Sequence, residues 1–537
     1  MYGDKAAFAL SSGGSSITTA PTTSDSLPPE MGESLPGVET EIGEGSAPEA
    51  PAREAVSVKG FLSDTVIFGA VGVFDRAIGF LLLPITTSWM TTREYGVLSM
   101  FTTTTEIMQY LVAMGILNSF FKHYAENTDE RSKREILNAS FWQITILASI
   151  MALLVIPWAG TWDKMIFGTG GVLLPLMIVP TTYFSVLISL GDCRLQADGK
   201  AFVYMFVNMF QTSTTRGLAL LLLALGWGAN GWIIGQSAGQ VASIVAFSFL
   251  AFSGLSFRPD PVWLGRLFRF GLALVPLAIS HWSMQGSARY MMNAMLDDPL
   301  HHIGLYTVGE RISQIMAMLN LAFVLGWRRF AFSNLHHADG AKLLGHGASV
   351  FFVLSAFAAT GLISLGDDLC RWMIRPDYWE GIRVIPYLTM AGFCWGVTEV
   401  IAISLYKSNK TYYLSGSYIV AAAICILLNF LLIRENGMIG AAQAWLCAEI
   451  AKLAMVFYFA QREFPIAIQF GRIAHALAIF IPTYLACSYF FANTTIASTF
   501  AQIGLVGMAP VILIATGFLE PTERDSIRAM IARVRGR

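Results

Sequence analysis

Runs of apolar residues recur along most of the chain and alternate with short polar segments. Many runs hold 18 or more residues, so each can cross a hydrocarbon layer about 30 Å thick as one helix. The pattern therefore predicts an all-α integral membrane protein with fourteen transmembrane helices. The expected ranges, accurate to a few residues at each end, are 61–89, 95–121, 136–158, 172–196, 202–226, 231–252, 264–295, 303–327, 347–366, 382–407, 412–433, 439–459, 473–491 and 503–519.

The composition supports this fold class. Hydrophobic residues make up 55% of the 537 residues and charged residues 13%, whereas a soluble domain has roughly 25% charged residues. The formal net charge is −1, and no basic domain is present to bind nucleic acid, so we expect no such partner. The six cysteines are scattered without a CxxC pair. We therefore expect no disulfide framework, no metal site and no cofactor.

Residues 1–57 differ in kind from the rest of the chain. Gly, Ser, Thr, Pro and Glu dominate this segment, and it contains no apolar run. Such a segment buries too little surface to offset its ordering entropy, so we expect a disordered tail. It lacks the basic start and apolar core of a cleaved signal peptide. The first transmembrane helix is therefore the expected insertion signal.

Basic residues indicate the orientation of the helices. With the N-terminus inside, 21 Lys and Arg residues fall on cytoplasmic segments and 6 on the opposite side. Cytoplasmic loops of membrane proteins carry such an excess. We therefore expect both termini in the cytoplasm, including a basic tail at 520–537.

The sequence contains a weak internal repeat. "YGVLSM" at Gly96 aligns with "IGLYTV" at Gly304, 208 residues later. "GKAFVYMFVN" aligns with "NKTYYLSGSY" at an offset of 210, and "GANGWIIGQSAG" aligns with "GMIGAAQAWLCA" at an offset of 209. Two parallel six-helix lobes can enclose a cavity and rock about it. The predicted domains are an N-lobe at 58–260, a C-lobe at 261–460 and an appended helix pair at 461–519.

Several of these stretches resemble a known family. They are "LSDTVIFGAVGVFDRAIGFLLLPITTSWMTTREYGVLSM", "FGLALVPLAISHW…ARYMMNAM…IGLYTVGERISQI" and "NKTYYLSGSYIVAAAICILLNFLLIRENGMIGAAQAW". Nearly all of 58–519 resembles the Wzx-type polysaccharide flippases of the multidrug/oligosaccharidyl-lipid/polysaccharide (MOP) superfamily. The resemblance implies a MATE-like bundle of twelve core helices plus extras, with a V-shaped central cavity. The family often has an Asp-Arg pair in the seventh helix, where this chain has Ala288–Arg289.

Ionisable residues inside the predicted helices are the candidate functional groups, because charges at membrane depth are costly and usually serve a function. Adjacent residues point about 100° apart on a helix, so Asp75 and Arg76 cannot simply neutralise each other. One face of the seventh predicted helix carries His281, Gln285 and Arg289, which are spaced at i, i+4 and i+8. Pro276, earlier in the same helix, permits a kink.

Arginine suits diphosphate binding because its guanidinium stays charged and binds phosphate in a bidentate fork. Arg289 also has no acidic neighbour in the sequence, which makes it the strongest candidate. The alternative for each arginine is an interhelical ion pair, for example Arg76 with Glu106. Glu449 and Lys452, three residues apart on one helix, are expected to pair with each other. The predicted substrate-binding residues are Arg76, Arg216, Arg289, Arg311, His281 and Gln285, and the predicted coupling or ion-pair residues are Asp75, Glu106, Glu310 and Glu399.

The resemblance implies that the chain is a transporter of the bacterial inner membrane rather than an enzyme, with a lipid-diphosphate-linked oligosaccharide as cargo. The expected carrier is undecaprenyl diphosphate bearing an O-antigen or exopolysaccharide repeat unit, and a glycan polymerase and chain-length machinery are candidate partners beside the membrane lipids. The coupling ion, Na⁺ or H⁺, stays open. One alternative is a MATE-type cation or drug antiporter, whose cavity would favour acidic and aromatic residues. A second alternative is a membrane glycan polymerase or ligase, which the short outward loops disfavour.

Overall fold

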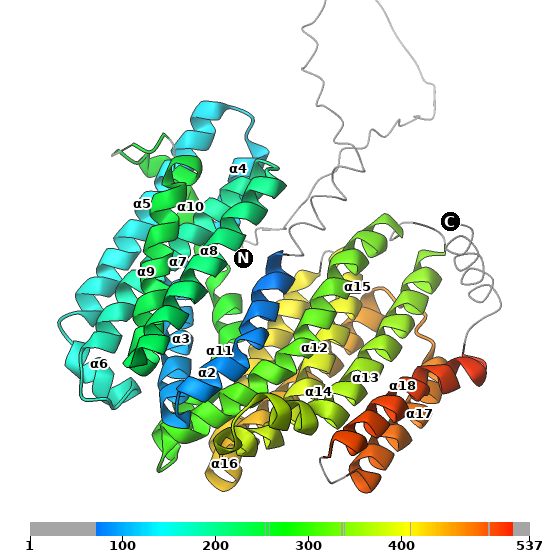
Figure 1. The fold of residues 1–537 in the computed structure, drawn as a ribbon. Coiled ribbons are helices and arrows are strands. Elements are labelled where there is room, and N and C mark those ends of the chain that lie inside the picture. Colours follow the sequence, from blue (N-terminus) through cyan, green and yellow to red (C-terminus); the bar gives the residue numbers. More distant parts are fainter. Residues whose placement is uncertain are drawn as a thin grey trace, which may run out of the picture. The chain divides into compact units, whose positions relative to one another are not determined.

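The computed structural model describes residues 71–518, except 253, 257, 335, 336, 338, 409 and 492–494. The predicted tails at 1–57 and 520–537 and the start of the first predicted helix lie outside the described residues. All described residues belong to one compact unit, residues 63–537. Every regular element within the described ranges is helical (Figure 1).

The first described segment, Val71–Trp89, is helical and contains a turn at Leu82. The part of this segment after the turn is α2. The elements are α2 Leu83–Trp89, α3 Thr92–Ala113, α4 Ile116–Glu126, α5 Glu130–Val155, α6 Ala159–Ile166, α7 Leu173–Ala197, α8 Ala201–Leu222, η1 Leu223–Trp227, α9 Gly228–Phe252, α10 Pro261–Leu272, α11 Val275–Met295, α12 Pro299–Asn334, α13 Gly340–Met373, η2 Pro376–Val384, α14 Ile385–Ile401, α15 Ile403–Lys407, α16 Thr411–Glu463, α17 Phe470–Phe490 and α18 Ile496–Ala515.

Local sequence fixes several helix starts. Thr91 and Glu94 form a reciprocal capping box at the start of α3, which satisfies backbone N–H groups that have no partner within the helix. Asp260 caps α10 by accepting a hydrogen bond from the Val262 N–H at 2.8 Å. Asp129 caps α5 through the N–H groups of the next turn. These hydrogen bonds to the carboxylate lower the pKa of Asp129.

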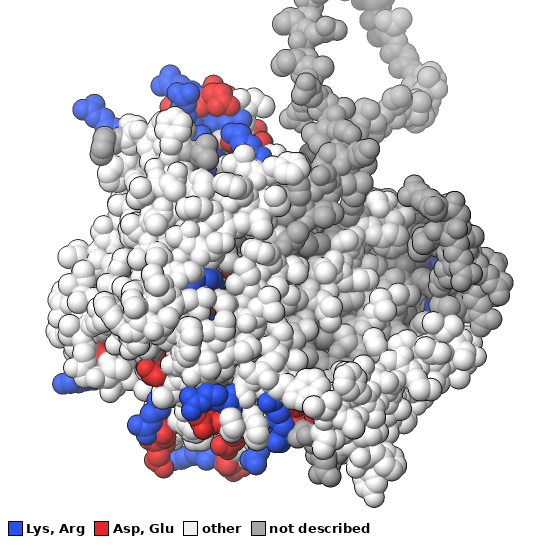
Figure 2. Space-filling model, viewed as in Figure 1, with Lys and Arg blue, Asp and Glu red and all other residues white. Residues whose placement is uncertain are grey.

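The chain is a multi-pass membrane protein. Among the described residues, ten helices are long and apolar enough to cross a membrane, or eleven if α10 and α11, bent by 46°, form one span. Figure 2 shows charged side chains gathered at two opposite ends of the visible face, with a broad band of other residues between them. Such a band is expected where side chains meet hydrocarbon.

Two of these long helical segments turn back on themselves at glycines. In Ala201–Phe249, Gly226 and Gly228 have φ values of 84° and 58°, and α8 packs against α9. In α16, Gly437 has φ 56° and ψ −132°. A Cβ atom on Gly440 would overlap the backbone of Leu432, so the two halves of α16 also pack closely. Glycine adopts such left-handed backbone without steric cost. Each segment is therefore a helical hairpin.

Two of the predicted helices are broken. The range 95–121 is interrupted at Met114 and Gly115, whose φ values are 37° and 72°, and it becomes α3 and α4. The range 264–295 becomes α10 and α11, with the 46° bend beside Pro276. Pro276 lacks the N–H needed to continue the hydrogen-bond ladder, as the sequence indicated. Hydropathy alone gave no sign of the first break.

Helices α3 and α12 cross at very short range, because each has a glycine at the crossing point. A Cβ atom on Gly96 would overlap the carbonyl oxygen of Leu300, and one on Gly304 would overlap the carbonyl oxygen of Thr92. Gly96 and Gly304 are 208 residues apart in the sequence, and so are Thr92 and Leu300. The two contacts are therefore those expected when equivalent helices of a repeat meet at a two-fold axis.

Polar contacts reinforce the same crossing. The hydroxyl groups of Ser99 and Thr307, again 208 residues apart, lie 2.6 Å from each other. At the N-terminal ends of the two helices, Arg93 pairs with Asp298 at 2.9 Å. The halves of the chain are thus fastened together at this end of the bundle.

Helices α17 and α18 form a hairpin beside the rest of the bundle and pack against α13 (Figure 1). Phe480 of α17 and Leu513 of α18 are buried in a hydrophobic cluster that also contains Phe351 and Ala356 of α13. The appended pair is therefore anchored through one helix of the second half.

Candidate functional site

Six of the ten predicted site residues form one charged network between helices from both halves of the chain. Arg216 lies 3.8 Å from Asp75, and it also interacts electrostatically with Arg311. Glu106 interacts electrostatically with Arg289, Glu310 and Arg311. The members are Asp75 in the first helix, Glu106 on α3, Arg216 on α8, Arg289 on α11, and Glu310 and Arg311 on α12.

Arg289 is the most firmly held member of the network. It is buried and forms an ion pair with Glu310. Its Nε donates to the Ser99 hydroxyl at 2.8 Å and its NH1 donates to the Gln285 carbonyl at 3.0 Å. Its guanidinium also lies 5.5 Å from the centre of the Tyr306 ring.

The reason for ranking Arg289 first among the arginines was therefore wrong. The sequence places no acid beside Arg289, but the structure supplies Glu310 from the next helix, 21 residues away. With its charge compensated and most donors engaged, Arg289 fastens α11 to α3 and α12 in this conformation.

The other three arginines form fewer or weaker contacts with described residues than Arg289 does. The Arg216 side chain is 29% exposed. Arg311 donates a long hydrogen bond, 3.4 Å, to the side-chain oxygen of Gln314. Arg76 is exposed. No ion pair joins Arg76 to Glu106 among the described residues, so the pairing suggested by the sequence is not formed here. The network itself contains three arginines, Arg216, Arg289 and Arg311, and three carboxylates, Asp75, Glu106 and Glu310, so its formal charges balance.

Three further predicted residues, His281, Gln285 and Glu399, lie in a second cluster. His281 Nε2 lies 3.3 Å from Gln285 Nε2, and His281 interacts electrostatically with Glu399 and Lys452. Glu399 accepts a hydrogen bond from Arg328 at 2.9 Å. This cluster joins α11, α12, α14 and α16, which all belong to the second half. The stripe that contains His281 and Arg289 therefore connects the two clusters.

The comparisons with known proteins bear on what these clusters serve. Residues 61–326 match the model of a family described as Polysaccharide biosynthesis protein. Through this match, the chain belongs to the polysaccharide biosynthesis protein family. A comparison with curated proteins gave no match.

Solved structures similar to this family member include two kinds of transporter. "Lipid II flippase MurJ, inward closed conformation" is 15% identical with a TM-score of 0.68, over 86% of this chain and 100% of that one. "Inward-facing conformation of a multidrug resistance MATE family transporter of the MOP superfamily" is 13% identical with a TM-score of 0.59, over 74% and 95%. The similarity shows that the chain has a MATE- and MurJ-like fold.

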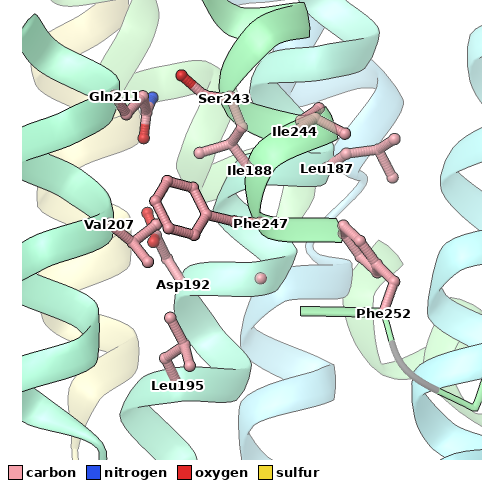
Figure 3. Close-up of a pocket in the computed structure, with 11 residues that line it drawn as sticks. Leu187, Ile188, Asp192, Leu195, Val207, Gln211, Ser243, Ile244, Phe247 and Phe252 are labelled. Atoms are coloured by element: carbon pink, nitrogen blue, oxygen red, sulfur yellow. The ribbon is translucent and has the colours of Figure 1, made fainter. Parts of the chain in front are cut away.

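The first half also contains a polar site that was not predicted from the sequence. Asn208 of α8 donates to Asp192 of α7 at 3.0 Å. Beside them is a cavity of about 30 Å³ (Figure 3), room for about one water molecule. Gln211 of α8 and Ser243 of α9 line the same cavity. The polar face of α8 around Asn208 therefore serves contacts among α7, α8 and α9.

Ser99 and Thr307 were also not predicted as site residues. The signal that could have found them is their position at the same place in the repeated segments "YGVLSM" and "IGLYTV". Residues at equivalent positions meet when two repeats share a symmetry axis.

The predicted pair of Glu449 and Lys452 is confirmed. The two charges lie 2.7 Å apart, with side-chain exposures of 4% and 0%. The Lys452 ammonium also lies 4.3 Å from the centre of the Tyr418 ring. The pair is thus removed from solvent and compensated locally.

Replacing Lys452 with methionine is expected to destabilise the protein by about 3–5 kcal/mol, because it leaves the Glu449 carboxylate buried without its partner. The double variant Glu449→Gln/Lys452→Met is expected to regain most of the loss. Thermal unfolding of the purified protein measures both. Lys342→Met, whose pair with Asp339 is exposed, is the control and is expected to unfold like the wild type. Equal stability of Lys452→Met and Lys342→Met would contradict this account.

Proposed function

We propose that the protein is a flippase that moves a lipid-diphosphate-linked oligosaccharide from the cytoplasmic to the periplasmic leaflet by alternating access. The proposed cargo is an undecaprenyl-diphosphate-linked repeat unit of O-antigen or exopolysaccharide, which would pass to a polymerase and chain-length machinery. The observation that carries the proposal is a charged network with three arginines, Arg216, Arg289 and Arg311, where helices of the two halves meet, in a chain of the polysaccharide biosynthesis protein family.

In this mechanism, Arg76, Arg216 and Arg311 contact the diphosphate. Guanidinium groups stay charged at membrane depth and bind phosphate oxygens in bidentate pairs. These three arginines have weak partners or none among the described residues, so an anion can engage them without first breaking a strong ion pair. Asp75 and Glu106 limit the charge of the network while no cargo is bound.

Arg289 and Glu310 have a different role in the proposal. Their ion pair, together with the Ser99 hydrogen bond, stabilises the state in which α3 and α12 are crossed at short range. Opening of the lobes at that end would break the Arg289–Ser99 and Ser99–Thr307 contacts. The residues thereby favour one of the two access states, and cargo binding would shift the balance.

We also propose fourteen spans in two lobes, 58–260 and 261–460, with an appended pair at 461–519 and both termini in the cytoplasm of a bacterial inner membrane. The two glycine hairpins support this count, because an unbroken helix of 49 residues would be about 74 Å long, more than twice the hydrocarbon thickness. The mutual glycine contacts of α3 and α12 support the two-lobed arrangement.

Deletion of the gene tests the proposed activity. Undecaprenyl-linked repeat units are expected to accumulate on the cytoplasmic face of the membrane, and restoring the gene is expected to clear them. The measurement is the leaflet distribution of the lipid-linked glycan in membrane vesicles. An unchanged distribution combined with increased sensitivity to cationic drugs would instead support a MATE-type antiporter. Normal transfer of the lipid-linked unit with unpolymerised glycan in the periplasm would support a polymerase.

A further inference from the structure

A second polar cavity lies far along the chain from the arginine network, between α13 and the appended pair. Its volume is about 310 Å³. Ser364 and Asp368 of α13 line it, four residues apart and so on one face of that helix, and Gln502 of α18 lines it from the other side. Figure 1 shows α17 and α18 beside α13.

The oxygen atoms of this cavity are unusual because they are buried without partners. Asp368 is 1% exposed, and neither of its carboxylate oxygens has a hydrogen-bond partner among the described residues. The Ser364 hydroxyl and the Gln502 side-chain carbonyl are likewise buried and unpartnered. Buried polar groups are normally satisfied, so four unpartnered oxygens around one cavity require an explanation.

A hydrogen bond from its amide nitrogen fixes the orientation of the Gln502 side chain. Its amide nitrogen donates to the backbone carbonyl of Phe491 at 3.2 Å, which leaves the side-chain oxygen as the free end. Thr499, one turn earlier on α18, lies close enough to Asp368 to interact through its side chain. The α18 face opposite Asp368 therefore presents oxygen atoms.

Two carboxylates, those of Asp367 and Asp368, and one guanidinium, that of Arg383, line the cavity. Asp367 accepts a hydrogen bond from Arg371 at 3.0 Å and is compensated. Arg383 lines the cavity from η2 and is exposed. Asp368 has no ion-pair partner among the described residues, and a buried, unpaired carboxylate is costly.

We propose that Asp368, Ser364 and Gln502 bind one sodium ion, which ties the α17–α18 hairpin to α13. Donor sets made only of oxygen suit hard cations. No group of three His, Cys, Asp or Glu residues among the described residues is placed to hold a metal, so one carboxylate with neutral oxygens fits a monovalent ion rather than a divalent one. The ion would neutralise Asp368 and satisfy the other two oxygens, with water completing its shell.

Thermal unfolding of the purified full-length protein tests this site. We expect the unfolding midpoint to rise by about 2–5 °C when sodium chloride replaces choline chloride at equal ionic strength, because a ligand bound only by the folded state stabilises it. Asp368→Asn is expected to lose the sodium-dependent rise. Asp367→Asn, in which the neighbouring acid is already compensated, is the matched control and is expected to keep it.

Binding of radioactive sodium to the same samples gives a readout that does not depend on unfolding. We expect one ion per chain in the wild type and in Asp367→Asn, and none in Asp368→Asn or Gln502→Leu. Equal midpoints in sodium and choline chloride would overturn the proposal. So would a larger rise with calcium chloride, or loss of binding only in Asp367→Asn. None of these outcomes depends on whether the protein exports glycan, so the two proposals fail separately.

Discussion

Replacing Arg311 with glutamate is expected to abolish export of the lipid-linked glycan without lowering the amount of protein in the membrane. Arg311 interacts electrostatically with Arg216 and Glu106, and its hydrogen bond to Gln314 is long, at 3.4 Å. A charge-assisted hydrogen bond is worth about 1.5–3 kcal/mol. Loss of a bidentate contact to phosphate therefore predicts a fall in export of at least about 100-fold, and the new carboxylate adds repulsion.

The measurement is accumulation of lipid-linked repeat units in a deletion strain that carries each variant, with membrane protein quantified in parallel. Arg311→Lys is expected to retain partial export, because lysine keeps the charge but not the bidentate geometry. Arg131→Glu is the matched charge reversal, since the Arg131 side chain is 87% exposed at the start of α5. Wild-type export by Arg311→Glu, or equal loss in Arg131→Glu, would contradict the proposed role.

Replacing Gly96 with leucine is expected to hold α3 and α12 apart and to stop transport. The added Cβ atom would overlap the Leu300 carbonyl oxygen, and a backbone atom cannot move aside as a flexible side chain can. Overpacking a tight contact costs about 1–3 kcal/mol, which lowers the population of the crossed state by about 5- to 150-fold. The protein is expected to reach the membrane, because the rest of each half is unchanged.

A disulfide reports the crossed state directly. Ser99→Cys and Thr307→Cys, introduced where the hydroxyl groups lie 2.6 Å apart, are expected to cross-link under oxidation in a background that lacks the exposed Cys447. Adding Gly96→Leu is expected to remove the cross-link, and adding Gly416→Leu is not, because a Cβ atom at Gly416 meets open space. Retention of the cross-link and of export in the Gly96 variant would refute the role of this contact.

The sequence was sufficient for features that depend on residues close together along the chain. Apolar runs predicted the helices, because a helix satisfies its own backbone hydrogen bonds in hydrocarbon. The spacing of Glu449 and Lys452 predicted their ion pair, because residues three apart face the same side of a helix. Pro276 predicted a bend because its missing N–H acts locally.

Tertiary structure alone decided which charges compensate one another and which do not. Glu310 reaches Arg289 from a different helix, and Asp192 of α7 accepts a hydrogen bond from Asn208 of α8. Asp368 of α13 meets Thr499 of α18, a helix more than 120 residues further along the chain. These outcomes depend on how helices distant in sequence cross and rotate, and crossing is set by packing such as the glycine contacts of α3 and α12. Hydrophobic periodicity fixes which residues share a helix face, but it contains no information on the neighbour that the face will meet.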